Sequence, residues 1–123
     1  MTQLLDFYRN VPMSVDYDVN SFIGQWVDNA VWSDKEYAKL EKSILNIQKK
    51  YPYPIDIPRE VIVFLYQIIE LMMVSGWSNF VIDKINANDQ TDMYDRFERF
   101  KVVISCVLSG EDINEIEFGY NPY

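Results

Sequence analysis

Apolar residues recur at helical spacing over most of the chain. From Asn20 onward they fall at Phe22, Ile23, Trp26, Val27, Ala30 and Val31. Two later segments repeat the pattern, with Tyr37, Leu40, Ile44 and Ile47 in residues 34–50 and with Met93, Phe97, Phe100, Ile104 and Val107 in residues 91–109. Such spacings place the apolar side chains on one face of an α-helix. The pattern therefore predicts three amphipathic helices.

A fourth helix is predicted over residues 58–75, which are apolar on almost every side. The run from Val61 to Val74 is interrupted only by Gln67 and Glu70. A helix that is apolar all round is usually buried, so this segment is expected to be the central element of the core, ending near Gly76. The run is shorter than the roughly 20 residues that span a bilayer, so no membrane role is expected.

Local signals mark where these helices begin and end. Ser33 and Glu36 have the spacing of a capping box, and Trp32 and Tyr37 have that of a hydrophobic staple. The helix that begins at this capping box should end before prolines 52 and 54, because the residue before a proline disfavours helical geometry. Gly110 suits the left-handed residue that ends the last helix.

The remaining segments are short. Residues 3–9 fit a short helix or an edge segment, residues 10–18 fit a loop, Phe80, Val81 and Ile85 fit a short helix, and residues 111–123 fit a turn or a short strand. Only four glycines and five prolines occur, too few for a turn-rich β-sandwich. We predict one all-α domain over residues 1–123, a bundle of four to five helices with a short irregular C-terminal tail.

Composition indicates a folded cytoplasmic protein. Apolar residues make up 49% of the chain, and Cys106 is the single cysteine, so no internal disulfide can form. The first residues, with Asp6 and no basic segment, do not resemble a secretory signal.

The net charge of −8 is concentrated at the two ends of the sequence. Residues 1–34 contain five acids and one base, and residues 102–123 contain four acids and no base. The intervening residues 35–101 contain ten of each. If the two ends meet in the fold, they form one acidic surface, which would attract a basic protein and repel nucleic acid and anionic membranes.

Groups suited to catalysis are scarce. The chain has no histidine, the commonest general base and zinc ligand, and Cys106 lies in an apolar helix, where a buried inert thiol is expected. The carboxylate pairs Asp16/Asp18 and Glu111/Asp112 could serve a glycosidase or a hard metal, but a solvated loop is the simpler interpretation. No enzyme activity, metal or cofactor is predicted, although a small carboxylate-based enzyme stays as a minor alternative.

Basic residues alternate with acids at helical spacing, which favours solvated, salt-bridged helix faces over a nucleic-acid site. The basic residues concerned are Lys35, Lys39, Lys42, Lys49 and Lys50 in one helix and Arg96, Arg99 and Lys101 in another.

Tyrosines beside the acidic ends indicate a protein interface, since tyrosine combines rigid apolar area with a polar tip. The predicted partner-binding residues are Asp16, Tyr17, Asp18, Asp28, Glu111, Asp112, Glu115, Glu117 and Tyr120. A role as a loop anchor is the competing interpretation for each tyrosine.

Three short motifs carry a family resemblance. Phe7-Tyr8-Arg9-Asn10-Val11-Pro12, the segment from Tyr17 to Gly24, and Tyr37-Ala38-Lys39-Leu40-Glu41 resemble small acidic immunity proteins encoded beside bacterial polymorphic toxins, including contact-dependent growth inhibition systems. The resemblance implies a cytoplasmic inhibitor that binds the toxic C-terminal domain of its cognate toxin, often a basic nuclease. Phe22, Gly24 and Leu40 in these motifs are expected to determine the fold rather than the interface.

The leading hypothesis is therefore a non-enzymatic immunity protein that neutralises a basic toxin domain. An acidic adaptor or nucleic-acid mimic is the alternative; it would bind several basic proteins, whereas an immunity protein should bind one. The sequence leaves the oligomeric state open.

Overall fold

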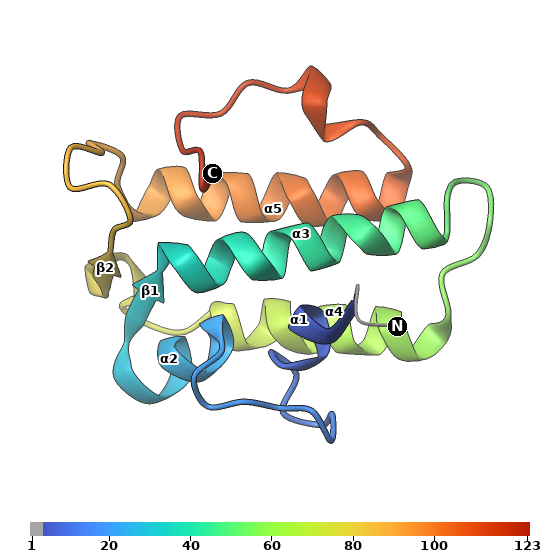
Figure 1. Ribbon diagram of the computed structural model, residues 1–123, viewed down its shortest axis with the longest axis horizontal. Helices are drawn as coiled ribbons and strands as arrows, with labels where there is room; N and C mark the ends of the chain where they lie inside the picture. The colour runs from blue at the N-terminus through green and yellow to red at the C-terminus, as the bar shows by residue number, and fades with distance from the viewer. Residues whose placement is uncertain (1–3) are drawn as a thin grey trace.

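The computed structural model describes residues 4–123, and α-helices account for most of them (Figure 1). The helices are α1 (Leu5–Tyr8), α2 (Phe22–Asn29), α3 (Asp34–Lys50), α4 (Arg59–Met72) and α5 (Met93–Ser109). Two 3₁₀ turns, η2 (Trp77–Asn79) and η3 (Ile113–Glu115), and two strands, β1 (Val31–Ser33) and β2 (Val81–Asp83), complete the described elements. Residues 1–3, part of the N-terminal segment considered above, lie outside that range.

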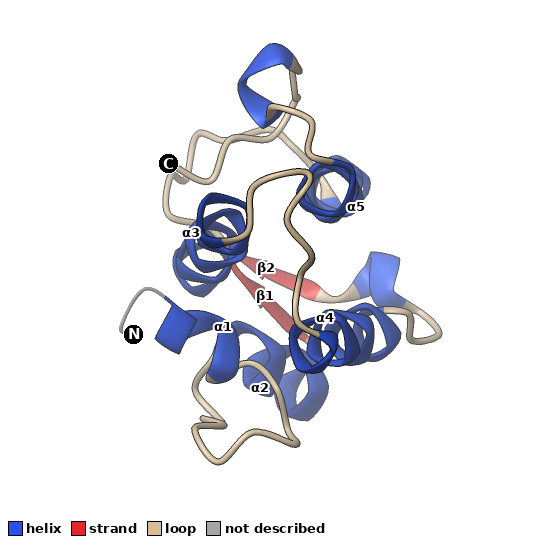
Figure 2. Ribbon diagram, turned by 90° about the vertical axis from the view of Figure 1, so that its right-hand side faces the viewer, coloured by secondary structure: helices blue, strands red, loops and turns tan. Residues whose placement is uncertain are grey.

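Helices α3 and α5 run side by side in the same direction, and α4 runs in the opposite direction on another side of α3 (Figures 1 and 2). The short α1 packs on α3, and α2 packs on α4. Phe22, Trp26, Trp32, Tyr37 and Phe97 form the aromatic centre of the core; the rings of Phe22 and Trp32 and those of Trp32 and Tyr37 have centroids 4.7 Å apart. The predicted inner faces of α3 and α5 are confirmed, because every residue assigned to them is buried.

The all-α prediction is wrong in one respect, because β1 and β2 form a small parallel sheet. Val31 pairs with Val81, Trp32 with Ile82 and Ser33 with Asp83. Ala30, at φ 56°, ends α2 in the left-handed region, so Val31 begins a strand rather than extending the helix. The short helix predicted over residues 80–85 is likewise replaced by β2, and η2 lies just before it. In the tail, the turn alternative is confirmed as the 3₁₀ turn η3, and residues 111–123 contain no strand.

The predicted capping contacts at the start of α3 are present in part. The Ser33 hydroxyl accepts the Glu36 amide at 3.2 Å, and the predicted staple forms between Trp32 and Tyr37. The Glu36 carboxylate bonds to Arg9 and Lys39. A complete capping box lies instead at the start of α5, between Asp92 and Asp95.

The three residues expected to determine the fold occupy tightly packed positions. Phe22 and Leu40 are fully buried. A Cβ atom at Gly24 would collide with the backbone carbonyl of Val19, so the N-terminal loop can close over α2 only with glycine there.

Candidate partner-binding surfaces

Two buried ion pairs join α3 to α5 and position the C-terminal tail. Arg96 donates to both carboxylate oxygens of Asp34, at 3.0 and 2.9 Å. One helical turn further along, Arg99 donates to both oxygens of Glu41, at 2.8 and 2.9 Å. Such paired geometry compensates for the loss of solvation on burial. Arg96 and Arg99 are therefore not part of a solvated face, which corrects the sequence-based interpretation of that cluster.

The tail lies over α3 and α5 (Figures 1 and 2), and its two tyrosines hold it there. The hydroxyl of Tyr120 donates to Asp34 Oδ1 at 2.7 Å, and that of Tyr123 donates to Glu41 Oε2 at 2.6 Å. Arg96 lies 4.3 Å from the centre of the Tyr120 ring, a cation–π distance. The acids of the two ion pairs therefore also bind the C-terminal tail, residues 111–123.

Burial and the adjacent carboxylates raise the pKa of three tyrosines well above the ordinary value. For Tyr37 and Tyr123 the causes are burial and Glu41, and for Tyr120 they are burial and Asp34. Folding therefore keeps these hydroxyl protons in place at pH values where the unfolded chain loses them.

Alkaline pH is expected to destabilise the fold through these tyrosines. Above the unfolded pKa of about 10, the folded chain binds more protons than the unfolded chain, so the buried Tyr37 and Tyr120 each lower the free energy of unfolding by up to about 1.4 kcal/mol per pH unit. The contribution is fully present below that pH. Tyr123 is 58% exposed and contributes less, because solvent screens its interaction with Glu41. Urea denaturation between about pH 8 and 11 should show this loss. The free energy of unfolding should fall less steeply with pH for Tyr120→Phe than for the wild type. Equal slopes for the two proteins would contradict the assignment.

The tail carries one acidic patch. Glu111, Asp112, Glu115 and Glu117 are all exposed, and none forms an ion pair with a described residue. Asp112 caps η3 by accepting the Asn114 amide at 2.9 Å, and Gln48 of α3 donates to the Glu111 carbonyl at 2.8 Å. These four acids, called the tail patch below, therefore project from an anchored segment.

A second acidic patch lies in the N-terminal loop and α2, with Asp16 and Asp28 exposed. Arg9 binds Asp6 and Asp18, each at 2.9 Å, so these two acids stabilise the loop. The amide of Asn20 and the Arg9 guanidinium lower the pKa of Asp18. Tyr17 is half-buried. Asp16 and Asp28, called the loop patch below, are the acids here that remain free to meet a partner.

The structure does not join the two acidic ends into one surface. The tail and the N-terminal loop lie on opposite sides of the molecule, with α3 and α5 between them (Figures 1 and 2). Asp34, counted with the N-terminal acids, is buried and paired with Arg96. Tyr120 is 1% exposed and bonds to Asp34, which favours the loop-anchor interpretation over its predicted role as a contact residue.

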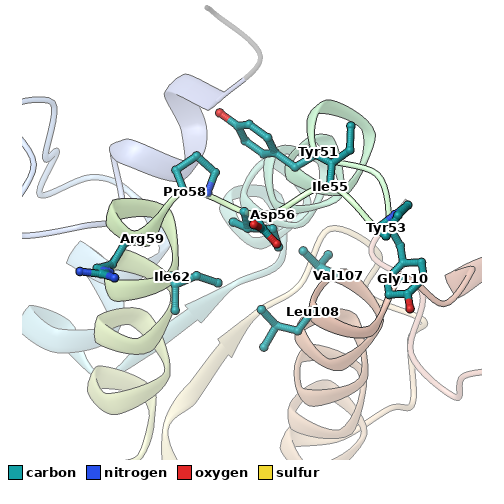
Figure 3. Close-up of a pocket in the computed structure, with 12 residues that line it drawn as sticks. Tyr51, Tyr53, Ile55, Asp56, Pro58, Arg59, Ile62, Val107, Leu108 and Gly110 are labelled. Atoms are coloured by element: carbon teal, nitrogen blue, oxygen red, sulfur yellow. The ribbon is translucent and has the colours of Figure 1, made fainter.

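An apolar surface that the sequence did not predict lies between α4 and α5. At one end, a hollow of about 770 Å³ opens beside the loop that follows α3 (Figure 3). Ile62 of α4 faces Val107 and Leu108 of α5 across it. Ile62 is 38% exposed, and Leu108 is 50% exposed. Helix α4 thus has an exposed apolar side and is not the fully buried centre of the core, and it ends at Met72, before Gly76.

The described residues offer little for catalysis. No cluster of three or more potential metal ligands occurs among residues 4–123. Cys106 is buried, as predicted, and burial raises the pKa of its thiol. No helix in the described range is long and apolar enough to cross a membrane. The geometry instead offers surfaces for a protein partner.

Comparison with known families agrees with this assignment. The sequence model of the family described as Immunity protein 41 matches residues 9–119, almost the whole chain. The chain belongs to the Immunity protein 41 family. The resemblance to immunity proteins of polymorphic toxin systems is thereby confirmed. Among curated proteins and solved structures, none matches the chain significantly.

Membership of the Immunity protein 41 family gives the surfaces a functional context. Immunity proteins neutralise a cognate toxin, so an exposed patch is of interest as a place where that toxin could bind. The matched range includes both the loop patch and the tail patch.

Proposed function

We propose that this Immunity protein 41 member acts in the bacterial cytoplasm and binds the C-terminal domain of one cognate toxin, and that the tail patch is its main contact. The observation that supports this is the set of four exposed carboxylates on a segment whose two tyrosines donate hydrogen bonds to the acids of the α3–α5 ion pairs. A fixed segment loses little conformational entropy on binding, and its charge steers a basic partner during encounter.

The proposed toxin domain is basic, and a nuclease fits best. Nucleases bind a polyanionic backbone through Lys and Arg, and an acidic inhibitor is complementary to that surface. Family membership favours this reading over the adaptor alternative, because immunity implies one cognate partner. Asp16, Tyr17, Asp18 and Asp28 form a secondary candidate contact on the opposite side. The chain itself is proposed to be non-enzymatic.

Co-expression and co-purification with the C-terminal domain of the toxin encoded upstream would test neutralisation. A one-to-one stoichiometry of chain to toxin domain that is stable at low salt, together with rescue of growth, would support the proposal. Failure to bind at low salt would rule it out, and capture of several unrelated basic proteins would favour the adaptor.

Charge reversal is expected to show which of the two acidic patches contacts the toxin domain. Glu115→Lys/Glu117→Lys should slow association with the toxin domain by at least about tenfold at low salt and flatten its salt dependence. Asp16→Lys/Asp28→Lys is a matched control, because it also reverses two exposed carboxylates. Stopped-flow rates over a series of salt concentrations would distinguish them. If association were slower only for the control, the loop patch rather than the tail patch would be the main contact.

A further inference from the structure

Helix α4 has two apolar stripes, and only one of them faces the core. Val61, Phe64, Leu65, Ile68 and Met72 form the buried stripe. The second stripe is formed by Ile62, Tyr66, Ile69 and, just past the helix end, Met73. Its spacing of four, three and four residues is that of a coiled-coil seam. Tyr66 is 62% exposed and Met73 is 63% exposed, whereas Ile69 is partly buried against the core, so most of this seam is uncovered.

Helix α5 supplies the second wall of the same face. A groove of about 260 Å³ between the helices is lined by Ile69, Met73, Phe97, Phe100, Lys101 and Ile104. Trp77 stacks on Phe97 with ring centroids 3.8 Å apart, near the start of α5. Tyr94, 63% exposed, and Leu108 extend the apolar surface along α5. We call this surface the α4–α5 face.

The extent of this face allows a contact of modest size. At 1.5 Å per residue, α4 and α5 are about 21 and 25 Å long, so two adjacent helices about 10 Å in diameter cover on the order of 400 Å² in projection. The accessible surface of such a ridged face is larger and extends onto the exposed Tyr53 and Ile55 of the neighbouring loop. A standard interface buries about 800 Å² per partner, and monomers seldom expose contiguous apolar patches of more than a few hundred Å².

The charges beside the seam are mixed, in contrast to the acidic patches. Arg59 and Glu70 lie on the outward side of α4, eleven residues or about three turns apart. Lys101 and Glu98 lie on the outward side of α5, with a distance of 3.6 Å between their charged groups. This mixture gives a basic toxin no electrostatic preference for the α4–α5 face.

We propose that the α4–α5 face binds a second copy of this chain, with the two α4 helices packed antiparallel across a two-fold axis. A two-fold interface must be self-complementary, since the same residues meet from both sides. Antiparallel packing brings Arg59 of one copy opposite Glu70 of the other at each end of the seam. Ile62, Tyr66 and Ile69 then cover one another between these charge pairs.

This dimer leaves the candidate toxin contacts accessible. The tail and the N-terminal loop project away from the side on which α4 and α5 lie together (Figure 2). Each copy can therefore bind its own toxin domain, so the neutralised species would contain two copies of each protein. The dimer does not depend on the proposed toxin contact.

Sedimentation velocity of the chain without toxin, over micromolar to submillimolar concentrations, tests the proposal. The wild type is expected to be a dimer, and Tyr66→Glu should raise its dissociation constant at least about tenfold while leaving the circular dichroism spectrum unchanged. Val15→Glu is the matched control, since Val15 is fully exposed, lies beside Glu60 and Phe64 rather than along the seam, and gains the same charge. A wild-type monomer over the whole range would overturn the proposal.

A charge swap tests the antiparallel register. Arg59→Glu alone and Glu70→Arg alone should each weaken self-association, because like charges then meet at both ends of the seam. An equimolar mixture of the two variants should restore the dimer, since each end again joins opposite charges. No recovery on mixing would overturn the antiparallel register. If wild type is monomeric and Tyr66→Glu loses toxin binding, the face belongs to the toxin and the dimer proposal is wrong.

Discussion

Arg96→Ala is expected to lower the free energy of unfolding by about 3–5 kcal/mol, enough to unfold a marginal domain. The Arg96 side chain is fully buried and donates to Asp34, Asp89 and the backbone carbonyls of Thr91 and Asp92. Its removal leaves Asp34 as a buried carboxylate without its cation. The cost comes from that uncompensated charge as well as from the lost bonds.

Urea denaturation of Arg96→Ala beside Lys101→Ala would measure this effect. Lys101 is exposed and its pair with Glu98 is long, so its loss should change stability by less than about 0.5 kcal/mol. The double variant Asp34→Asn/Arg96→Met should lose less stability than the sum of its single variants, because no unpaired charge remains. A loss below about 1 kcal/mol for Arg96→Ala would show that Asp34 is adequately solvated or paired without it.

The contrast between Arg96 and α3 shows what local sequence can predict. Helix α3 was predicted at both ends and on its buried face, because its cap, its staple and its apolar spacing lie within a few residues of one another. Arg96 has acids near it at helical spacing, which is also the pattern of a solvated face. Its main partner, Asp34, lies 62 residues away, so only the tertiary fold distinguishes a buried ion pair from a surface one.

The same reasoning explains the other differences. Strands β1 and β2 are three residues long, too short to show an alternation of apolar and polar residues. They also pair across fifty residues, so local sequence does not reveal their contact. The apolar character of α4 was visible, but its composition could not show which side lies in the core. Counting Asp34 among the terminal charges overstated the acidic surface, since net charge does not reveal which carboxylates are paired.

Tyr120→Ala is expected to cost about 3–5 kcal/mol, comparable to the loss of other large core rings. The ring packs against Trp32, Tyr37 and Arg96, and its hydroxyl donates to Asp34. The change would also release the tail from α3 and α5, so the tail patch would no longer be held in place. Urea denaturation would report the loss of stability, and proteolysis within residues 111–123 would report the release.

Tyr120→Phe separates anchoring from contact with the toxin. It removes only the bond to Asp34 and should cost about 1–2 kcal/mol, while the ring keeps the tail in place. Because Tyr120 is 1% exposed, the rate of association with the toxin domain should match that of the wild type. A slower association at unchanged stability would instead show that Tyr120 meets the toxin directly, which requires the tail to open on binding. The pair of variants therefore decides whether the tail acts as a fixed platform, as its bonds to Asp34 and Glu41 indicate.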